Sequence, residues 1–360
     1  SPINRLHSSN SGFTSKEPWR YSRDARATME AHLRLRHRLV PYLYTWARRS
    51  AGEGIAPVRP VYHDHPRELA AYEHRGSFCF GDLLVVPFTS PLDVATGLGR
   101  ELTWLPDGVW YDLPTGRRYE ATTGGRGRML SLSRPLDRIG VLARAGSVIP
   151  LAGNLTEAAG DNPRELEIVV VPGGSGSFTL EEDDGSAQPG EDQIARTHMA
   201  LTWPEAEEED GADVVLRIRL EGAAEVVPAS RLVTVRLLAG QVAGAWLGVG
   251  ERARRLATEE VSGDGFTLGA GTLVHLEELS RQELIDGVQL VLRGTKHSPA
   301  DWRDEVHAIL DAARVEYMAK DLAWDAVQRG LSGTALLGEL EALGLPETLR
   351  AAVAEVLPHS

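Results

Sequence analysis

The chain has 360 residues, a formal net charge of −13 and a hydrophobic fraction of 42%, which together indicate a globular protein of two or three domains. This charge argues against a general binder of nucleic acid or of anionic membranes. No apolar run approaches the roughly 20 residues that a membrane-spanning helix needs. Cys79 is the only cysteine, so an intramolecular disulfide is excluded and a buried, inert thiol is expected. A reducing cytoplasm is the compartment that fits this cysteine usage.

The first regular element predicted is a long helix. Residues 1 to about 23 are rich in Ser, Asn and Gly and are expected to form a loop. From about Asp24 to Ser50, apolar residues recur at helical spacing along one stripe. They are Met29, Leu33, Leu39, Leu43 and Ala47, and the stripe is widened by Leu35, Val40, Tyr44 and Trp46. Pro41 lies inside this pattern and should kink or split the helix, because proline removes a backbone donor.

From Ala56 the period changes to that of β-strands. Short runs rich in Val, Leu and aromatic residues alternate with turn signals such as 106–108 (Pro-Asp-Gly), a spacing typical of an antiparallel sandwich. The polar stretch 152–164 is predicted to link this first β domain to a second one. There, the runs 213–220 and 234–237 alternate apolar and polar residues, as half-buried strands do.

The last sixty or so residues are predicted to be helical. Ser298 is expected to cap a first helix with Pro299 in its first turn, and two short helices should follow around 336–337 and 348–357. The first helix carries an apolar stripe of Val306, Ile309, Leu310 and Ala313. This stripe would either cover a face of a sandwich or pair with another subunit in a homo-oligomer, and the sequence leaves both open.

One candidate binding segment lies near the start of the chain. Arg5-Leu6-His7 stands among small polar residues. A neutral imidazole offers one donor and one acceptor and a guanidinium offers a fork of donors, so the loop suits a polyhydroxyl ligand. On this pattern alone, a structural hydrogen bond is the more common role of a loop histidine.

Three other patterns are better explained without a ligand. His63 and His65 would share a face of a strand, which suggests a metal site, but no third ligand is evident. The run 181–185 (Glu-Glu-Asp-Asp-Gly) lacks the alternate-ligand spacing of a calcium loop and is expected to be a solvated turn. The run 173–176 (Gly-Gly-Ser-Gly) lacks the spacing of a phosphate loop and leads into a strand, so a hairpin connection is expected.

Four aromatic residues of the first β domain allow two interpretations. They could form a platform on which sugars stack, which would make the β domains a carbohydrate-binding module. The alternation of the sequence instead places some of them in the core, which is the more frequent position of such residues. The four are Trp104, Trp110, Tyr111 and Tyr119.

A collinear series of motifs covers residues 1 to about 151. Arg5-Leu6-His7 and Glu17-Pro18-Trp19 are followed by longer segments. These segments are 35–44 (LRHRLVPYLY), 57–60 (PVRP), 80–87 (FGDLLVVP), 105–112 (LPDGVWYD) and 135–150 (PLDRIGVLARAGSVIP). The series resembles the C-terminal portion of family 31 glycoside hydrolases, the α-glucosidase and α-xylosidase family. A weaker match at 180–185 resembles a turn of that family's last sandwich.

The resemblance implies a mainly β fold made of two consecutive antiparallel β-sandwiches. Residues 1–55 would be the last loop and helix of a catalytic (β/α)8 barrel, 56–151 the proximal sandwich, 152–295 the distal sandwich and 296–360 a helical extension without counterpart. His7 would contact the sugar in the first subsite, and Arg5 would brace its loop. The two catalytic carboxylates of the family would lie upstream of Ser1, so this chain alone is expected to be inactive. No cofactor and no metal are implied.

The expected function is therefore that of the downstream part of a larger, retaining α-glycosidase. It would release terminal non-reducing α-linked glucose from an oligosaccharide or another α-glucoside. An α-xylosidase of the same family is the alternative within this class. A non-catalytic carbohydrate-binding or structural β-sandwich protein is the alternative from another class.

Overall fold

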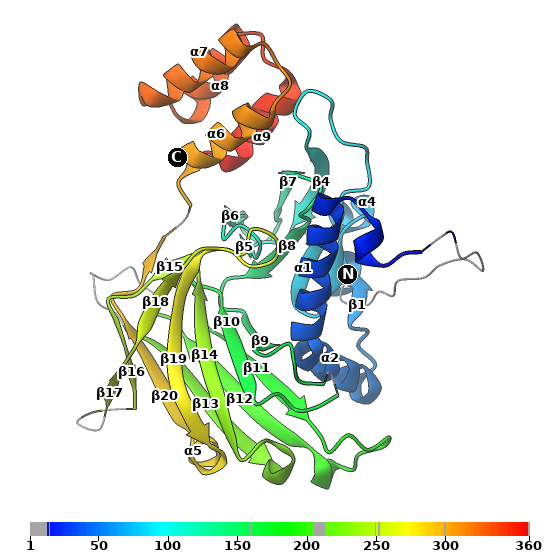
Figure 1. Cartoon of the computed structure of the whole chain (residues 1–360), viewed down its shortest axis with the longest axis vertical. Coiled ribbons are helices and arrows are strands. Elements are labelled where there is room, and N and C mark those ends of the chain that lie inside the picture. Colours follow the sequence, from blue (N-terminus) through cyan, green and yellow to red (C-terminus); the bar gives the residue numbers. More distant parts are fainter. Residues whose placement is uncertain are drawn as a thin grey trace.

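The structure, a computed structural model, describes residues 13, 15–158, 160–204, 213–248, 250, 253–298 and 300–358. In this part of the chain, a pair of helices lies beside two β bodies, and a group of four helices caps one end (Figure 1). The fold is mainly β with antiparallel sandwiches, as the sequence predicts.

The N-terminal helix is split, as Pro41 predicts. A short 3-10 helix, η1 (Pro18–Arg20), precedes α1 (Arg23–Arg38), and α2 (Val40–Glu53) follows after Leu39. Ser22 caps α1 by accepting a hydrogen bond from the backbone amide of Ala25. Pro41 occupies the first turn of α2, where a backbone donor has no helical partner to lose.

The predicted apolar stripe is only partly correct. Leu39 is buried, but Ala47 is exposed and Met29 is half-buried. Trp46, at the edge of the predicted stripe, is buried, and so is Tyr42, which lies outside it. The break at Leu39 changes the phase of α2 relative to α1.

The first β body contains one six-stranded sheet and one antiparallel pair. The sheet has the order β1-β2-β3-β8-β5-β6, and β4 pairs with β7. Side chains from both fill the space between them, among them Leu105, Leu132 and Leu142. The strands are β1 (Val58–Pro60), β2 (Phe78–Phe80), β3 (Leu83–Val86), β4 (Gly99–Leu105), β5 (Val109–Asp112), β6 (Arg118–Glu120), β7 (Arg128–Arg134) and β8 (Gly140–Arg144), with the helices α3 (Val61–Asp64) and α4 (Leu69–Glu73).

The second β body is a sandwich of a five-stranded and a six-stranded sheet. Their orders are β18-β19-β14-β10-β9 and β11-β12-β13-β20-β16-β17, and β15 pairs with β21. The elements are β9 (Val148–Ala152), β10 (Glu165–Val170), β11 (Gly176–Glu182), η2 (Glu191–Gln193), β12 (Ala195–Thr202), β13 (Val214–Gly222), η3 (Ala224–Val226), β14 (Ser230–Leu238), β15 (Gly240–Gln241), β16 (Gly244–Leu247), β17 (Arg254–Leu256), β18 (Thr258–Val261), β19 (Gly271–Ser280), α5 (Arg281–Asp286), β20 (Val288–Arg293) and β21 (Lys296–His297).

Two features of the second body differ from the simple pattern that the sequence suggests. β9 was expected to close the first β domain, but it pairs with β10, so the chain passes from one body to the other within the turn 145–147. β10 and β14 run parallel, because the chain crosses to the other sheet and back between them, and parallel neighbours need such a crossover.

A single core joins α2 to both β bodies. It runs from Tyr42 and Trp46 through Phe80 and Val85 to the interior of the second body. The N-terminal helices are therefore packed on the sandwiches as part of one hydrophobic unit.

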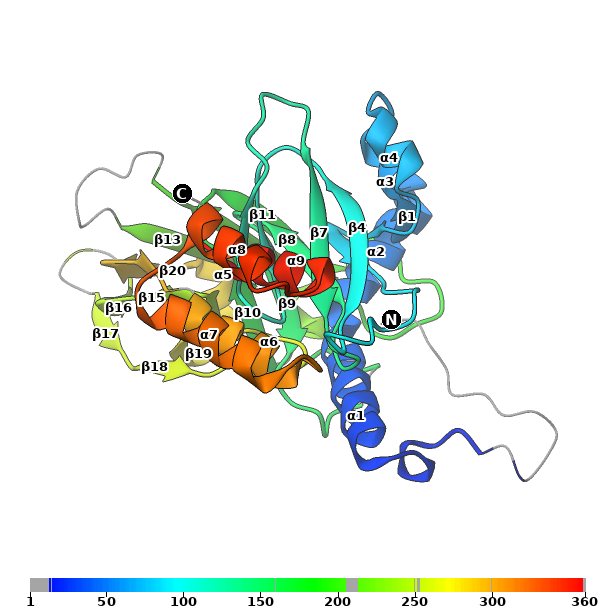
Figure 2. The same cartoon turned by 90° about the horizontal axis from the view of Figure 1, so that it is seen from above.

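The terminal helices form a unit with its own core. They are α6 (Trp302–Ala312), α7 (Tyr317–Gln328), α8 (Gly333–Ala342) and α9 (Glu347–Val356). Val306, Leu310 and Ala313 are buried in this core, and α9 contacts β7 (Figure 2). The expected start at Ser298 is wrong, because the cap is Asp301, which accepts a hydrogen bond from the amide of Arg303; Pro299 lies outside the described residues. The sequence analysis also missed α7, whose buried face is mainly alanine.

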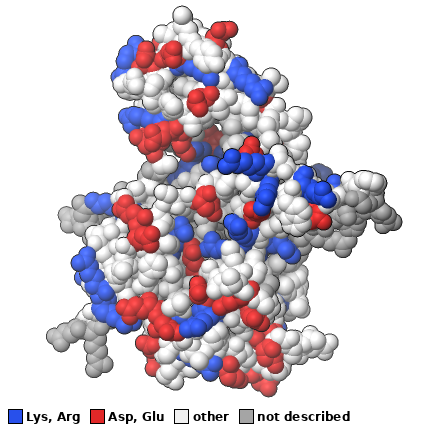
Figure 3. Space-filling view, viewed as in Figure 1, with Lys and Arg blue, Asp and Glu red and all other residues white. Residues whose placement is uncertain are grey.

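On the face shown in Figure 3, acidic and basic side chains are intermingled. No helix in the described part of the chain is long and apolar enough to cross a membrane.

Candidate functional site

The predicted sugar-binding residues, Arg5 and His7, lie outside the described residues, so their roles stay predictions. What the structure shows is how the helices that follow this loop are held. In η1, Pro18 is buried whereas Trp19 is largely exposed.

An aromatic cluster fixes α2 against both β bodies. The ring of Tyr42 stacks on Phe178 of β11 at 5.3 Å and lies 5.7 Å from Phe80 of β2, between ring centroids. The hydroxyl of Tyr42 accepts a hydrogen bond of 2.8 Å from the backbone amide of Asp82, and burial raises the pKa of this hydroxyl. Tyr42 therefore acts as a neutral, buried anchor between α2 and the two β bodies.

Gly81 makes this close packing possible. It has a φ of +56°, and a Cβ placed on it would lie 2.3 Å from the hydroxyl oxygen of Tyr42 and 2.4 Å from Nε1 of Trp46. Both the backbone conformation and the space therefore require glycine.

We expect Gly81→Ala to lower the free energy of unfolding by roughly 3 kcal/mol, since it combines left-handed strain with overpacking. Gly97 is the matched control, because its φ is +69° and nothing lies within 4 Å of a Cβ there. Gly97→Ala should carry only the backbone strain, about 1 kcal/mol. Denaturant midpoints of both variants measure the difference, and equal losses would contradict the contact with Tyr42.

The acidic turn, residues 181–185, begins with the last two residues of β11 and binds α2, contrary to the solvated turn that was expected. Glu181 pairs with Arg48 of α2 at 2.9 Å, and its backbone amide donates to Thr45. Tyr44 donates to the carboxylate of Asp183. These carboxylates therefore have protein partners, which the sequence spacing did not indicate.

Within the same turn, Glu182 is buried and forms a two-pronged ion pair with Arg231 of β14. This pair ties the turn to the sheet on the other side of the second body.

The remaining sequence patterns also find structural explanations. His63 lies in the short helix α3 and His65 at its end, so the strand on which they would share a face does not exist. No group of three or more His, Cys, Asp or Glu residues in the described ranges is placed to hold a metal ion. The glycine-rich run 173–176 is not a hairpin, because β10 and β11 belong to different sheets and the run crosses between them.

The four aromatic residues of the first β body belong to its core. Trp104, Trp110, Tyr111 and Tyr119 are each exposed by 7% or less. A sugar-stacking platform built on them is therefore excluded.

A polar hollow of about 300 Å³ opens between α2 and the two β bodies. Leu84 and Trp110 are among its lining residues. Its polar lining includes Arg59 of β1, Asp64 of α3, Asp82 of the β2–β3 turn, Arg144 of β8, Ser147 of the β8–β9 turn and Ser177 of β11. Tyr42, His65, Cys79 and Ser175 also line it.

Some charged groups around this polar hollow have an ion-pair partner and others do not. Arg59 is buried and binds Asp64 through two hydrogen bonds of 2.8 and 3.0 Å. The side chain of Asp82 is exposed, but the surrounding protein atoms partly desolvate its carboxyl group and raise its pKa. The positive charges of Arg49 and Arg59 oppose this rise. Burial raises the pKa of the neighbouring Cys79 thiol to about 12, so this cysteine is not a nucleophile at neutral pH.

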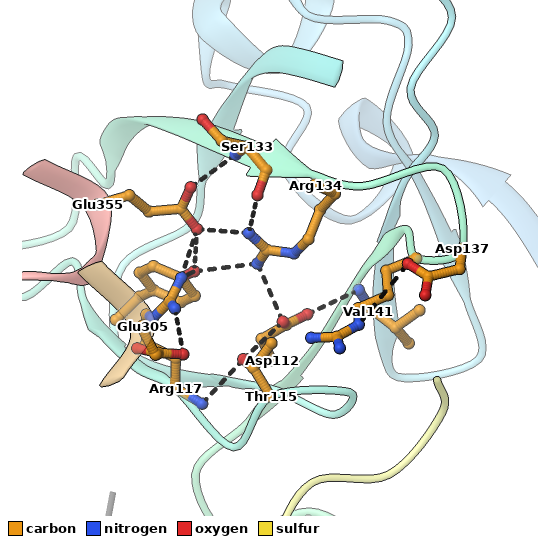
Figure 4. A network of polar contacts seen from close by, with 11 residues as sticks. Asp112, Thr115, Arg117, Ser133, Arg134, Asp137, Val141, Glu305 and Glu355 are labelled. Atoms are coloured by element: carbon orange, nitrogen blue, oxygen red, sulfur yellow. Dashed lines mark hydrogen bonds and ion pairs between the residues drawn. The ribbon is translucent and has the colours of Figure 1, made fainter. Parts of the chain in front are cut away.

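A second polar cluster joins the terminal helices to the first β body (Figure 4). Glu355 of α9 accepts hydrogen bonds from Arg134 at 2.6 Å, Arg117 at 2.8 Å and the Tyr119 hydroxyl at 2.6 Å. It also accepts from the backbone amide of Ser133. Burial opposes the charge of Glu355, but the two arginines outweigh it and keep the pKa of the carboxyl below its usual range. The helices thus cover a face of the sandwich, which was one of the two open alternatives.

Comparisons with known proteins agree with this architecture. Residues 1–46 match the model of the TIM-barrel domain of glycosyl hydrolases family 31, and residues 54–149 match that family's C-terminal domain. The chain is 29% identical over 211 residues to an alpha-xylosidase of Saccharolobus solfataricus, covering 58% of this chain and 27% of that protein. It is 26% identical over 225 residues to the lysosomal alpha-glucosidase of Mus musculus, covering 58% of this chain and 23% of that protein.

Among solved structures, a family 31 dextranase of Flavobacterium johnsoniae complexed with isomaltotriose superimposes with a TM-score of 0.62 at 18% identity. That match covers 78% of this chain and 34% of the dextranase. The α-xylosidase of Xanthomonas citri gives a TM-score of 0.50 at 26% identity, covering 62% of this chain and 23% of that chain.

The barrel-end helices followed by two sandwiches are thus the architecture of the C-terminal region of a glycoside hydrolase. Over residues 1–46 and 54–149, the chain matches the models of glycoside hydrolase family 31. It spans about a quarter of the length of the curated relatives named above.

Proposed function

We propose that this chain is the C-terminal part of a retaining α-glycosidase that releases terminal non-reducing α-linked glucose from oligosaccharides. The observation that carries the proposal is the family match over residues 1–46 and 54–149. In the proposed enzyme, the sandwiches hold α2, and α2 in turn holds the barrel end that carries Arg5 and His7.

No pair of catalytic carboxylates is assigned within the chain. A retaining glycosidase sets two carboxyl groups about 5–5.5 Å apart, one as nucleophile and one as acid/base. The acidic residues described above are bound to arginines or tyrosine, apart from Asp82, which stands without such a partner. The family resemblance implies that both catalytic carboxylates lie upstream of Ser1, and the proposal places them there.

Hydrolysis of α-xylosides is the second candidate. It is favoured by the similarity to the alpha-xylosidase of Saccharolobus solfataricus and to that of Xanthomonas citri. The two substrates differ by one hydroxymethyl group, and a pocket discriminates only modestly over such a group.

Release of an aryl leaving group from an α-glucoside and an α-xyloside tests the proposal. We expect the intact gene product to prefer the glucoside and this chain alone to be inactive. A preference for the xyloside would change the substrate and keep the class. Turnover by this chain alone would overturn the placement of the carboxylates.

The role of His7 is tested in the intact protein. His7→Ala should lower kcat/KM by roughly tenfold to a hundredfold, the worth of one hydrogen bond to a charged or developing-charge group. His63→Ala is the matched control, because His63 is an exposed histidine of α3. An equal loss in both variants would contradict sugar contact by His7.

A further inference from the structure

The polar hollow between α2 and the two β bodies has unused hydrogen-bonding groups. The carboxylate of Asp82 and the hydroxyls of Ser147 and Ser177 make no hydrogen bond to the described residues. Arg144 donates only to the backbone carbonyl of Asp107, at 3.3 Å. A strong acceptor, a fork of donors and two hydroxyls thus line one cavity.

The charge of the polar hollow selects a neutral ligand. Arg59 and Asp64 neutralise each other through their close pair, and burial lowers the pKa of His65, which favours its neutral form. Among the described residues that line the polar hollow, this leaves one negative group, Asp82, and one positive group, Arg144. An anionic ligand would meet Asp82 and a cationic one would meet Arg144. A neutral molecule with neighbouring hydroxyl groups can donate to the carboxylate and accept from the guanidinium at once.

Size fits the same class. The volume of about 300 Å³ is at the lower end of small-molecule sites. Leu84 and Trp110 also line the cavity, but each is exposed by 7% or less, so the polar groups would make most of the contacts with a ligand. With Asp64 held by Arg59, Asp82 is the only unpaired carboxyl group among the described residues that line the cavity, and a two-carboxylate mechanism of hydrolysis needs a second one.

We propose that the polar hollow is a non-catalytic binding site for a neutral sugar, with Asp82 and Arg144 bracketing adjacent hydroxyl groups. Its lining comes from α2 through Tyr42, from the first β body and from β11 of the second β body, so a bound sugar would lie between all three parts. This site does not depend on the proposed hydrolytic activity, because it needs no residue upstream of Ser1.

Calorimetric titration of this chain with glucose, maltose and isomaltose tests the site, with glucose 6-phosphate and glucosamine as charged probes. We expect at least one neutral sugar to bind in the millimolar range and both charged probes to bind more weakly. Asp82→Asn and Arg144→Gln should each weaken the neutral sugar at least tenfold. Asp325→Asn, a change at an exposed aspartate of α7, should leave binding unchanged.

Three results would overturn the site. The first is that no neutral sugar gives a heat of binding at concentrations up to about 50 mM, because a Kd above that value would correspond to negligible affinity. The second is binding that survives both Asp82→Asn and Arg144→Gln. The third is glucose 6-phosphate binding more tightly than glucose, which would indicate an anion site.

Discussion

Replacing Glu355 with Gln is expected to lower the free energy of unfolding by about 3–5 kcal/mol, the cost of leaving a buried charge without its partner. Arg134 is 3% exposed and has two acidic partners, Asp112 and Glu355. Without the charge of Glu355, the buried Arg134 keeps Asp112 as its acidic partner, and the half-buried Arg117 keeps only the partly exposed Glu305. The terminal helices should then separate from β7 before the sandwiches unfold.

Hydrogen exchange of α6 and α9, together with denaturant midpoints, measures this effect. Glu347→Gln is the matched control on the same helix. Glu347 is largely exposed and pairs with Arg100 at 3.5 Å, and exposed ion pairs contribute little to stability. Unchanged exchange in α9 of the Glu355 variant would show that apolar packing alone holds the helices.

The pH dependence of this attachment has a defined sign. The pKa of Glu355 is lower in the folded protein than in the unfolded chain. Its contribution is therefore complete above the unfolded value of about 4.3 and is lost as the pH falls through the folded value. We expect the helices to stay attached at neutral pH and to be released only in acid.

The features that sequence could predict are those with a local signal. Pro41 splits the N-terminal helix because proline lacks a backbone N–H donor, which affects the helix at that position. In β13, alternation places Val214, Leu216 and Ile218 in the core and their neighbours outside it. The presence of proline is enough to predict the first feature, and the alternation of apolar and polar residues is enough to predict the second.

The features that sequence missed depend on residues far apart in the chain. Glu355 and Arg134 are separated by 221 positions, and no periodicity links them. The acidic turn was expected to be solvated because its partners, Arg48 on α2 and Arg231 on β14, come from other parts of the chain. The sequence also does not indicate why Gly81 is needed, because the Tyr42 side chain that packs against it lies about 40 positions earlier in the chain.

Arg231→Met is expected to cost about 3–5 kcal/mol of the free energy of unfolding, because it leaves the carboxylate of Glu182 buried and unpaired. Arg231 is 1% exposed and Glu182 3%. Arg231 also donates to the carbonyl of Pro163 at 2.9 Å, so it connects the acidic turn, the segment before β10 and the sheet of β14. Loss of this connection should also loosen α2, since Glu181 and Asp183 on either side of Glu182 bind it.

The double variant Glu182→Leu/Arg231→Met separates pairing from packing. Burying an ion pair costs desolvation that its attraction only roughly offsets, so apolar replacement of both partners can be close to neutral. We expect the double variant to recover most of the stability that Arg231→Met loses. Arg164→Met provides the control, because the Arg164–Glu278 pair is exposed on both sides. If the double variant is as unstable as the sum of the two single ones, the pair contributes through shape and backbone contacts. If it recovers, the role of Arg231 is to neutralise a carboxylate that the acidic turn carries into the core, and the docking of α2 follows from the two carboxylates that flank it.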